Sequence, residues 1–411
     1  MLTNKFLKLQ SCLFRLLGFE LLAKSCSCSW QQPHRTFASL LAVLSFLPLT
    51  VCFGLRHIQN LNNLTDALCS LLIDVLAVFK LGLLICRHKD IMQLLHSLQQ
   101  LLHEECRQGA AAAIIAQQNK REQFISGLYK NIFIVSAASA CLMPLLRMLY
   151  IFYRYGQVEP ALPFPSVYPW HNRHLLNYSV SYAWNVCAAA AVLLPTVCVD
   201  TLYCALTHNL CALFQIAQHK FKHATVADYN AQRGVGQLDL LTLYQRTLDL
   251  TGTLNACFRL LVTVQFLIAS LHLCVLSYQM ATNLLQPDVL FFFAFTCSIL
   301  AQVYLYCYCG ECVKDESMRI TAAIYECSWL EMTCQLPGLS QTLQLSMLRA
   351  QRASCIRGYF LEANRITFVK VSATDRRTDR QTEGPSHILT HFCLQIVKTA
   401  MSYVTLLRSM S

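Results

Sequence analysis

The sequence predicts an all-α polytopic membrane protein with seven transmembrane helices, a cytosolic amino terminus and a helical intracellular anchor. Of its 411 residues, 55% are hydrophobic and only 13% are charged, and the mean hydropathy is +0.41. A soluble globular domain usually carries about 25% charged residues. The apolar residues also gather in separate runs of about 20, the length that a helix needs to cross a bilayer. Composition and run length both favour a membrane protein.

Six apolar segments are long enough to span a bilayer. They cover residues 36–55, 64–86, 131–152, 178–206, 260–282 and 288–309. An earlier apolar run, residues 13–23, contains Arg15 and Glu20 and is not followed by a small-residue cleavage site. We therefore expect no signal peptide and a cytosolic amino-terminal segment over residues 1–35.

A seventh helix, residues 396–410, mixes polar and apolar positions. At about 100° per residue, four polar side chains fall within one narrow arc of this helix. They are Lys398, Ser402, Thr405 and Ser409. A helix with such an arc is too polar to face lipid on that side, and the segments before it are membrane spans. We expect the arc to line a pore.

Lysine and arginine residues set the orientation, because they concentrate in cytosolic loops. The amino terminus and residues 87–130, 207–259 and 310–352 carry nearly all of them outside the last helix. Both glycosylation sequons, at Asn63 and Asn177, fall in the opposite set of loops, which is therefore extracellular. This orientation is the reverse of a G-protein-coupled receptor, and the Asp-Arg-Tyr and Asn-Pro-x-x-Tyr motifs of that class are absent.

The three inner loops are long and helical in character. In residues 91–106, leucines recur at i, i+4 and i+7, as they do in an amphipathic helix. They are Leu94, Leu95, Leu98, Leu101 and Leu102. Because apolar stripes need a partner, we expect these loops to project into the cytosol and pack together as a base for oligomerisation.

The remaining composition excludes several classes of protein. The net charge of +11 is spread over loops without a basic, aromatic-rich motif, so no nucleic-acid partner is expected. The 22 cysteines avoid the outer segments and are expected as buried apolar residues or reduced thiols. The group Cys307, Cys309 and Cys312 has no matching ligand pair at a zinc-site spacing, so no metal or other cofactor is expected. No nucleophile, base and orienting partner occur at a recognisable spacing, which argues against an enzyme.

Several motifs, in order along most of the chain, resemble those of the insect odorant receptor family. They are LPFPSVYPW in residues 162–170; Gly310, Glu316-Ser317, AIYE in residues 323–326 and Trp329; LRAQRA in residues 348–353; and KTAMSYVTLLR in residues 398–408. The sister family of gustatory receptors shares the inverted topology, but its last helix carries Thr-Tyr, five apolar residues and Gln-Phe, which this chain lacks. The gustatory type is kept as an alternative.

The resemblance implies a subunit of a ligand-gated, non-selective cation channel. Members of the family assemble as tetramers with a shared odorant co-receptor around a pore lined by the seventh helix. The implied ligand is a small volatile odorant, and the implied location is the plasma membrane of sensory neuron dendrites, in contact with membrane lipid. A metabotropic seven-helix chemoreceptor is the second interpretation. A transporter is the third, although the chain lacks paired, interrupted helices in corresponding halves.

In the family, the odorant pocket lies in the outer half of the subunit. Mapped by depth, the outer halves of the second, third, fourth and sixth spans offer Cys69, Ile73, Met143, Tyr150, Tyr182, Trp184, Phe291 and Phe293. Aromatic and methionine side chains suit a volatile ligand, which offers few hydrogen bonds. Alignment with the family places a hydrophobic gate at Leu406 and Met410, at the flank of the polar arc.

A charged residue inside a membrane span needs a partner or water. We hypothesise an interhelical ion pair between Asp74 and Arg147, which lie in the second and third spans at depths that a long arginine can bridge. Lys80 lies nearer the inner surface, and we expect its ammonium group to snorkel to the headgroups.

The chain divides into residues 1–35, residues 36–357 with six spans and the anchor loops, and residues 358–411 with the pore helix. Residues 371–395 interrupt this last part with a charged segment that contains Gly384 and Pro385 and cannot lie in hydrocarbon. Removing it gives TFVKIVKTAMSYVTLLRSM, the spacing of the family. Val371-Ser372 can be encoded GTAAGT and Gln395 can be encoded CAG, the ends of an intron, so we hypothesise a retained intron; a genuine loop is the alternative.

Overall fold

The computed structural model describes residues 7–19, 33–106, 109–156, 160–170, 174–223, 239–283, 289–327, 339–359, 362–363 and 366. These residues are almost entirely helical, and the only β-bridge among them joins Arg357 to Glu362. The predicted pore helix, residues 396–410, and the proposed insertion, residues 371–395, lie outside the described residues.

Nine helices are described in these parts of the chain. They are α1 (Lys8–Leu17), α2 (Pro33–Arg56), α3 (Leu61–Cys86), α4 (His88–Glu105), α5 (Gly109–Tyr155), α6 (Leu175–Lys222), α8 (Asp239–Thr282), α9 (Val289–Tyr325) and α11 (Leu339–Gln351). Six of them, namely α2, α3, α5, α6, α8 and α9, are long and apolar enough to cross a membrane. The all-α membrane fold predicted from composition is confirmed.

Four of these helices continue well beyond the predicted spans. α5 begins at Gly109 and α8 at Asp239, while α6 runs on to Lys222 and α9 to Tyr325. The hydropathy window that defines a predicted span stops where charged residues begin. The helices do not stop there, because an apolar stripe continues and is buried against neighbouring helices. We call these extensions, together with α4 and α11, the distal bundle.

The apolar stripe predicted for the first inner loop is confirmed in α4. Its leucines are buried, with Leu94 and Leu98 at 1% and 0% exposure. Ion pairs at the surface link the same elements, since Lys220 Nζ lies 2.5 Å from Glu105 Oε2 and Lys222 Nζ lies 2.5 Å from Glu326 Oε2. Apolar packing and these charges hold the distal bundle together.

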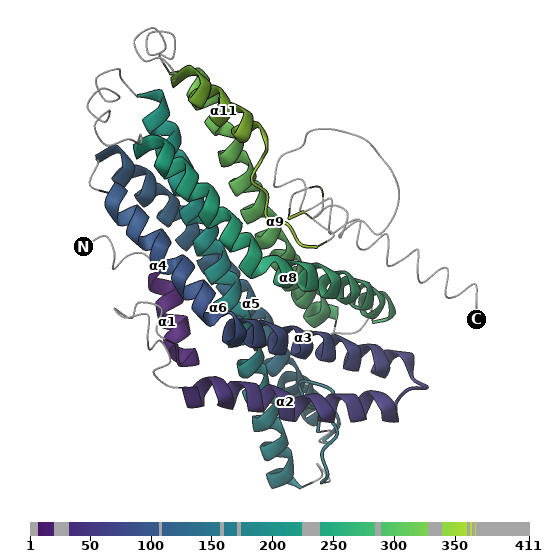
Figure 1. Cartoon of the computed structure of the whole chain (residues 1–411). Coiled ribbons are helices and arrows are strands. Elements are labelled where there is room, and N and C mark those ends of the chain that lie inside the picture. The colour runs from purple at the N-terminus through teal and green to yellow at the C-terminus, as the bar shows by residue number, and fades with distance from the viewer. Residues whose placement is uncertain are drawn as a thin grey trace.

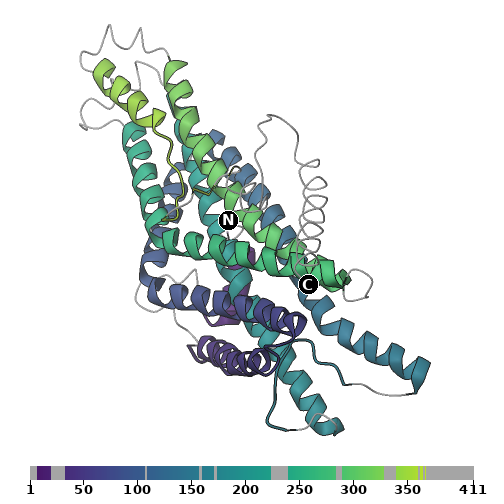
Figure 2. The ribbon, with the colours of Figure 1, turned by 90° about the vertical axis from the view of Figure 1, so that its right-hand side faces the viewer.

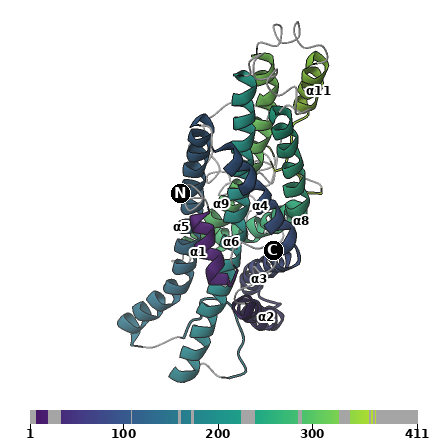
Figure 3. The ribbon, with the colours of Figure 1, turned by 60° about the vertical axis from the view of Figure 1, so that its left-hand side comes forward.

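α6 is the axis of the molecule (Figure 1). It contacts α1, α2, α3, α4, α5, α8 and α9, and nearly every side chain from Thr196 to Phe214 is buried. α2 and α3 lie side by side across the lower part of the bundle, as Figure 2 shows from another side. The lower ends of α5 and α6 diverge (Figure 3).

α5 presents apolar residues on the outside of the bundle. Leu142, Leu146 and Leu149 recur at intervals of four and three residues, and each is more than half exposed. In water such a stripe would be costly, whereas hydrocarbon accepts it. This face of α5 therefore indicates where lipid surrounds the chain.

Candidate ligand cavity

A cavity of about 710 Å³ lies among the helices. α2, α3, α5, α6, α8 and α9 all contribute to its wall, as does the loop segment 160–166. Much of the wall is aromatic or thioether in character. These side chains are Phe46, Phe53, Phe133, Met143, Phe164, Phe291, Phe292 and Phe295.

Half of the residues predicted to form the pocket lie in this wall. They are Cys69, Ile73, Met143 and Phe291. Four others lie outside it: Tyr150, Trp184 and Phe293 are 60%, 37% and 43% exposed, and the hydroxyl of Tyr182 donates to the carbonyl of Cys141. Depth along a span can be counted in a sequence, but the rotation of each helix cannot. The four outside residues lie on parts of their helices that the cavity does not reach.

Two polar atoms in the cavity wall have no hydrogen-bond partner among the described residues. One is Oδ2 of Asp74 on α3, and the other is Nε2 of His272 on α8. The side chains are only 5% and 1% exposed, so water outside the bundle does not solvate them. A buried polar atom without a partner is destabilising. A ligand that carries one hydrogen-bonding group could satisfy either atom.

The charges of the hypothesised ion pair line the same cavity. Asp74 reaches it from α3 and Arg147 from α5. The ion pair between them stays a hypothesis.

An extended loop forms part of the cavity wall, and a buried amide on α6 contributes to its anchoring. The side chain of Asn185, on α6, is fully buried; its Oδ1 accepts from Phe164 N at 3.1 Å and its Nδ2 donates to the Tyr168 hydroxyl at 2.8 Å. Burial raises the pKa of Tyr168, so this phenol stays protonated and donates to the carbonyl of Ser181. The loop is the LPFPSVYPW motif, and its anchor Asn185 was not predicted.

A buried network of charged and polar side chains joins four helices next to the cavity. Lys80 Nζ lies 2.6 Å from Asp200 Oδ1, and both side chains are fully buried. The predicted snorkelling of Lys80 was wrong, because Asp200 supplies a counter-charge inside the bundle. Three further donors complete the shell around this carboxylate: the hydroxyls of Tyr129 and Tyr306, and the amide of Gln302, whose side chain also lines the cavity.

Asp200 itself was missed by the sequence analysis. It lies within the predicted fourth span, residues 178–206, and an acidic residue inside a span needs a partner. The sequence analysis applied this rule to Asp74 and Arg147. The same rule could have identified Asp200 as well. It could not have paired Asp200 with Lys80, because the two residues are 120 positions apart.

The two sequons lie at helix starts. Asn63 is in the first turn of α3, where its backbone N–H donates to Oδ1 of Asn60. Asn63 also lines the cavity. Asn177 is in the first turn of α6.

The predicted pore and gate residues all lie outside the described part of the chain. They are Lys398, Ser402, Thr405, Leu406, Ser409 and Met410.

Comparison with known proteins agrees with this architecture. A family model described as 7tm Odorant receptor matches residues 60–374. The chain is 46% identical over 383 residues to "Putative odorant receptor 98b" of Drosophila melanogaster, covering 93% of this chain and 99% of that protein. It is 33% identical to odorant receptor 47a of the same species over 99% of this chain and 100% of that protein.

A solved structure has a similar fold. The olfactory receptor OR5 of Machilis hrabei, determined in complex with eugenol, superposes with a TM-score of 0.72 at 15% identity, covering 96% of this chain and 97% of that one. The family match and the two Drosophila relatives establish the class: this chain is a member of the insect odorant receptor family, and not an enzyme.

Proposed function

We propose that the chain is the odorant-binding subunit of a ligand-gated, non-selective cation channel, and that its ligand occupies the 710 Å³ cavity. The cavity is the observation that carries this proposal. Its volume lies within the range of about 300–1,000 Å³ that is typical of small-molecule sites, and its wall is mainly apolar with a few polar groups.

The wall favours an odorant with an apolar body and one hydrogen-bonding group. Phenylalanine rings such as Phe291 and Phe295, which stack with centroids 5.9 Å apart, offer flat surfaces for dispersion contacts. The Asp74 carboxylate oxygen can accept a hydrogen bond from a hydroxyl group, and Nε2 of His272 can accept from a hydroxyl or, when it carries the proton, donate to a carbonyl. A fully apolar odorant would leave both atoms unsatisfied and would bind less tightly.

The proposed Asp74 and Arg147 ion pair would place a charge beside the same ligand. Both residues line the cavity, which supports the pairing. Exchanging the two charges tests it: if each single reversal is silent and the exchanged double variant responds to odorant, the pair exists, whereas a silent but surface-expressed double variant excludes it.

The buried network connects the cavity wall to the packing of four helices by hydrogen bonds. Gln302 lines the cavity and donates to Asp200 Oδ2 at 2.7 Å, and Asp200 in turn holds Lys80 of α3. A ligand that displaces Gln302 changes the hydrogen bonding of a carboxylate shared by α3, α5, α6 and α9. We propose that this change shifts the packing of α9.

The pore belongs to the seventh helix in this proposal. Four such helices, contributed by this chain and the shared co-receptor in a heterotetramer, would surround the pore in the plasma membrane of sensory neuron dendrites. The polar arc would face the ions, and Leu406 and Met410 would form the gate. The distal bundle, with its apolar stripes, would form the base of the assembly.

The insertion at residues 371–395 bears directly on conduction. The family match ends at residue 374, just inside the insertion, which supports the retained-intron hypothesis. Sequencing of transcripts from olfactory tissue tests it. Reads that join the Lys370 codon directly to the Ile396 codon support the splice. If every read across this region retains the codons of residues 371–395, the hypothesis is excluded.

Expression with the odorant co-receptor tests the proposed function. Residues 371–395 are removed from this chain, which is then expressed together with the co-receptor. These cells should show inward current when oxygen-bearing volatile odorants are applied. Cells that express the co-receptor alone should show none. Equal responses with and without this chain would overturn its assignment as the odorant-binding subunit.

A further inference from the structure

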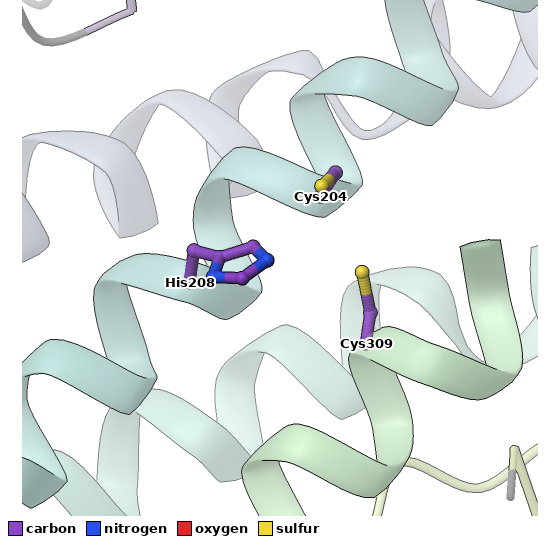
Figure 4. Close-up of side chains that lie close together, drawn as sticks. All are labelled: Cys204, His208 and Cys309. Carbon is purple, nitrogen blue, oxygen red and sulfur yellow. The ribbon is translucent and has the colours of Figure 1, made fainter. Parts of the chain in front are cut away.

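Three metal-ligand side chains meet inside the bundle beyond the cavity and the Asp200 network. Cys204 and His208 lie one turn apart on α6, and Cys309 lies on α9 (Figure 4). Their ligand atoms are all within 4.8 Å of one another, and the residues are buried, at 0%, 3% and 0% exposure. The proposed channel function makes no use of them.

The histidine of this group is prepared to act as a ligand. Its Nδ1 lies 3.0 Å from Oε1 of Gln118 on α5, an acceptor, so Nδ1 carries the proton and donates it. The lone pair of His208 is therefore on Nε2. This atom has no hydrogen-bond partner among the described residues, and in Figure 4 it points toward the two sulfur atoms.

In a metal-binding histidine, the N–H of the second ring nitrogen usually donates a hydrogen bond to an oxygen acceptor such as a carbonyl or a carboxylate. This bond fixes the tautomer and the ring orientation. Gln118 does this for His208. The orphaned Nε2 atom and the amide behind the ring are independent of the cysteine positions, and both indicate an ion between the three side chains.

We propose that Cys204 Sγ, Cys309 Sγ and His208 Nε2 bind one zinc ion. Thiolate and imidazole are the ligands that zinc prefers, and two thiolates balance its charge, so the buried site would be neutral. Binding releases the two thiol protons, and a small ligand such as water completes the tetrahedron. In a tetrahedral site the two sulfur atoms would lie roughly 3.8 Å apart. The ligand atoms now lie within 4.8 Å of one another, so small side-chain rotations would bring them to the distances of a zinc site.

The ion would join α6 to α9 at a specific register. Cys204 lies one helical turn after Asp200, and Cys309 follows Tyr306 by nearly a turn, so the zinc site continues the contact that the carboxylate makes with the same two helices. The sequence analysis expected no metal, because it considered Cys309 only together with Cys307 and Cys312. The other two ligands, Cys204 and His208, are spaced Cys-x-x-x-His on a different helix, a pattern unlike that of a zinc finger.

Metal content of the purified full-length chain tests the proposal. The chain is prepared in detergent with zinc and copper both present, washed free of excess ions, and analysed by mass spectrometry for both metals. We expect one zinc per chain in the wild type, and none in the combined Cys204→Ser, His208→Gln and Cys309→Ser variant. Cys198→Ser is the matched control, since this cysteine is buried on α6 outside the group and should leave one zinc bound.

A second measurement uses the wild-type chain alone, so that a variant's misfolding cannot decide the result. A strong chelator should increase the alkylation rate of Cys204 and Cys309 at least tenfold and leave that of Cys198 unchanged. Zinc content that is the same in the wild type and the combined variant would overturn the proposal, as would copper in place of zinc. A disulfide between Cys204 and Cys309 in a metal-free wild-type chain would overturn it too.

Discussion

The ammonium nitrogen of Lys80 lies 2.6 Å from Oδ1 of Asp200, and neither side chain is exposed to solvent. The pair joins α3 to α6 beside the ligand cavity. Gln302 connects it to the cavity wall, and Tyr129 and Tyr306 complete the hydrogen bonding of the carboxylate. A buried charge pair whose acceptors are all occupied opposes separation of its helices, because separation would leave buried charges without partners.

Removal of one charge of this pair should destabilise the protein. Lys80→Met leaves the Asp200 carboxylate buried without its counter-charge, and such changes cost about 3–5 kcal/mol. Thermal unfolding of the purified chain should show a lower midpoint. The double variant Lys80→Met with Asp200→Leu should recover part of the loss, since it leaves no buried charge.

The matched control for that experiment is an exposed pair. Arg87 and Asp90 lie 3.0 Å apart with half of each side chain exposed. Arg87→Met should change stability by about 1 kcal/mol or less, as is usual for surface ion pairs. Equal effects of the Lys80 and Arg87 substitutions would contradict the role given to the buried pair.

Replacement of Asn185 should loosen the loop at the cavity wall. Asn185→Leu removes the acceptor of the Phe164 N–H and the amide donor to the Tyr168 hydroxyl, a loss of about 1–3 kcal/mol in local stability. The Tyr168 hydroxyl keeps its bond to the Ser181 carbonyl. Odorant dose–response curves should move to higher concentrations, because the loop segment 160–166 forms part of the wall. Val180→Ala, on the same helix but 56% exposed and outside the cavity wall, should leave the curves unchanged.

A larger side chain at Ile73 should exclude large odorants. Ile73 lines the cavity, and Ile73→Phe fills part of its volume. Responses to the largest odorants of a series should fall several-fold relative to those to the smallest. Leu68→Phe is the control on the same helix, because Leu68 is 38% exposed and outside the wall. An unchanged size ranking for Ile73→Phe would argue that the ligand binds elsewhere.

A side chain at position 310 should displace the segment that follows α11. A Cβ built on Gly310 would lie 2.1 Å from the carbonyl oxygen of Ala363, so Gly310→Ala forces the two backbones apart. We expect a loss of stability of about 1–3 kcal/mol and reduced current, because this segment precedes the proposed seventh helix in the chain. Gly252→Ala, where a Cβ meets nothing within 4 Å, should be neutral or slightly stabilising.

Sequence reasoning located what depends on local pattern and missed what depends on distant pairing. The leucine stripe of α4 is buried as predicted, because its period belongs to one helix. The burial of Lys80 was missed, because its counter-charge at Asp200 comes from another helix. Ile73 and Trp184 were chosen by the same depth argument, yet only Ile73 lies in the cavity wall, since packing of neighbouring helices decides rotation.

Current in an excised patch tests the central claim most directly. Membrane from cells expressing this chain, with residues 371–395 removed, together with the odorant co-receptor is isolated without nucleotides, and odorant is applied to its outer face. A ligand-gated channel should open under these conditions and pass cations. Current that requires GTP, or that is lost on excision and restored by cytosol, would contradict the channel and favour a metabotropic receptor.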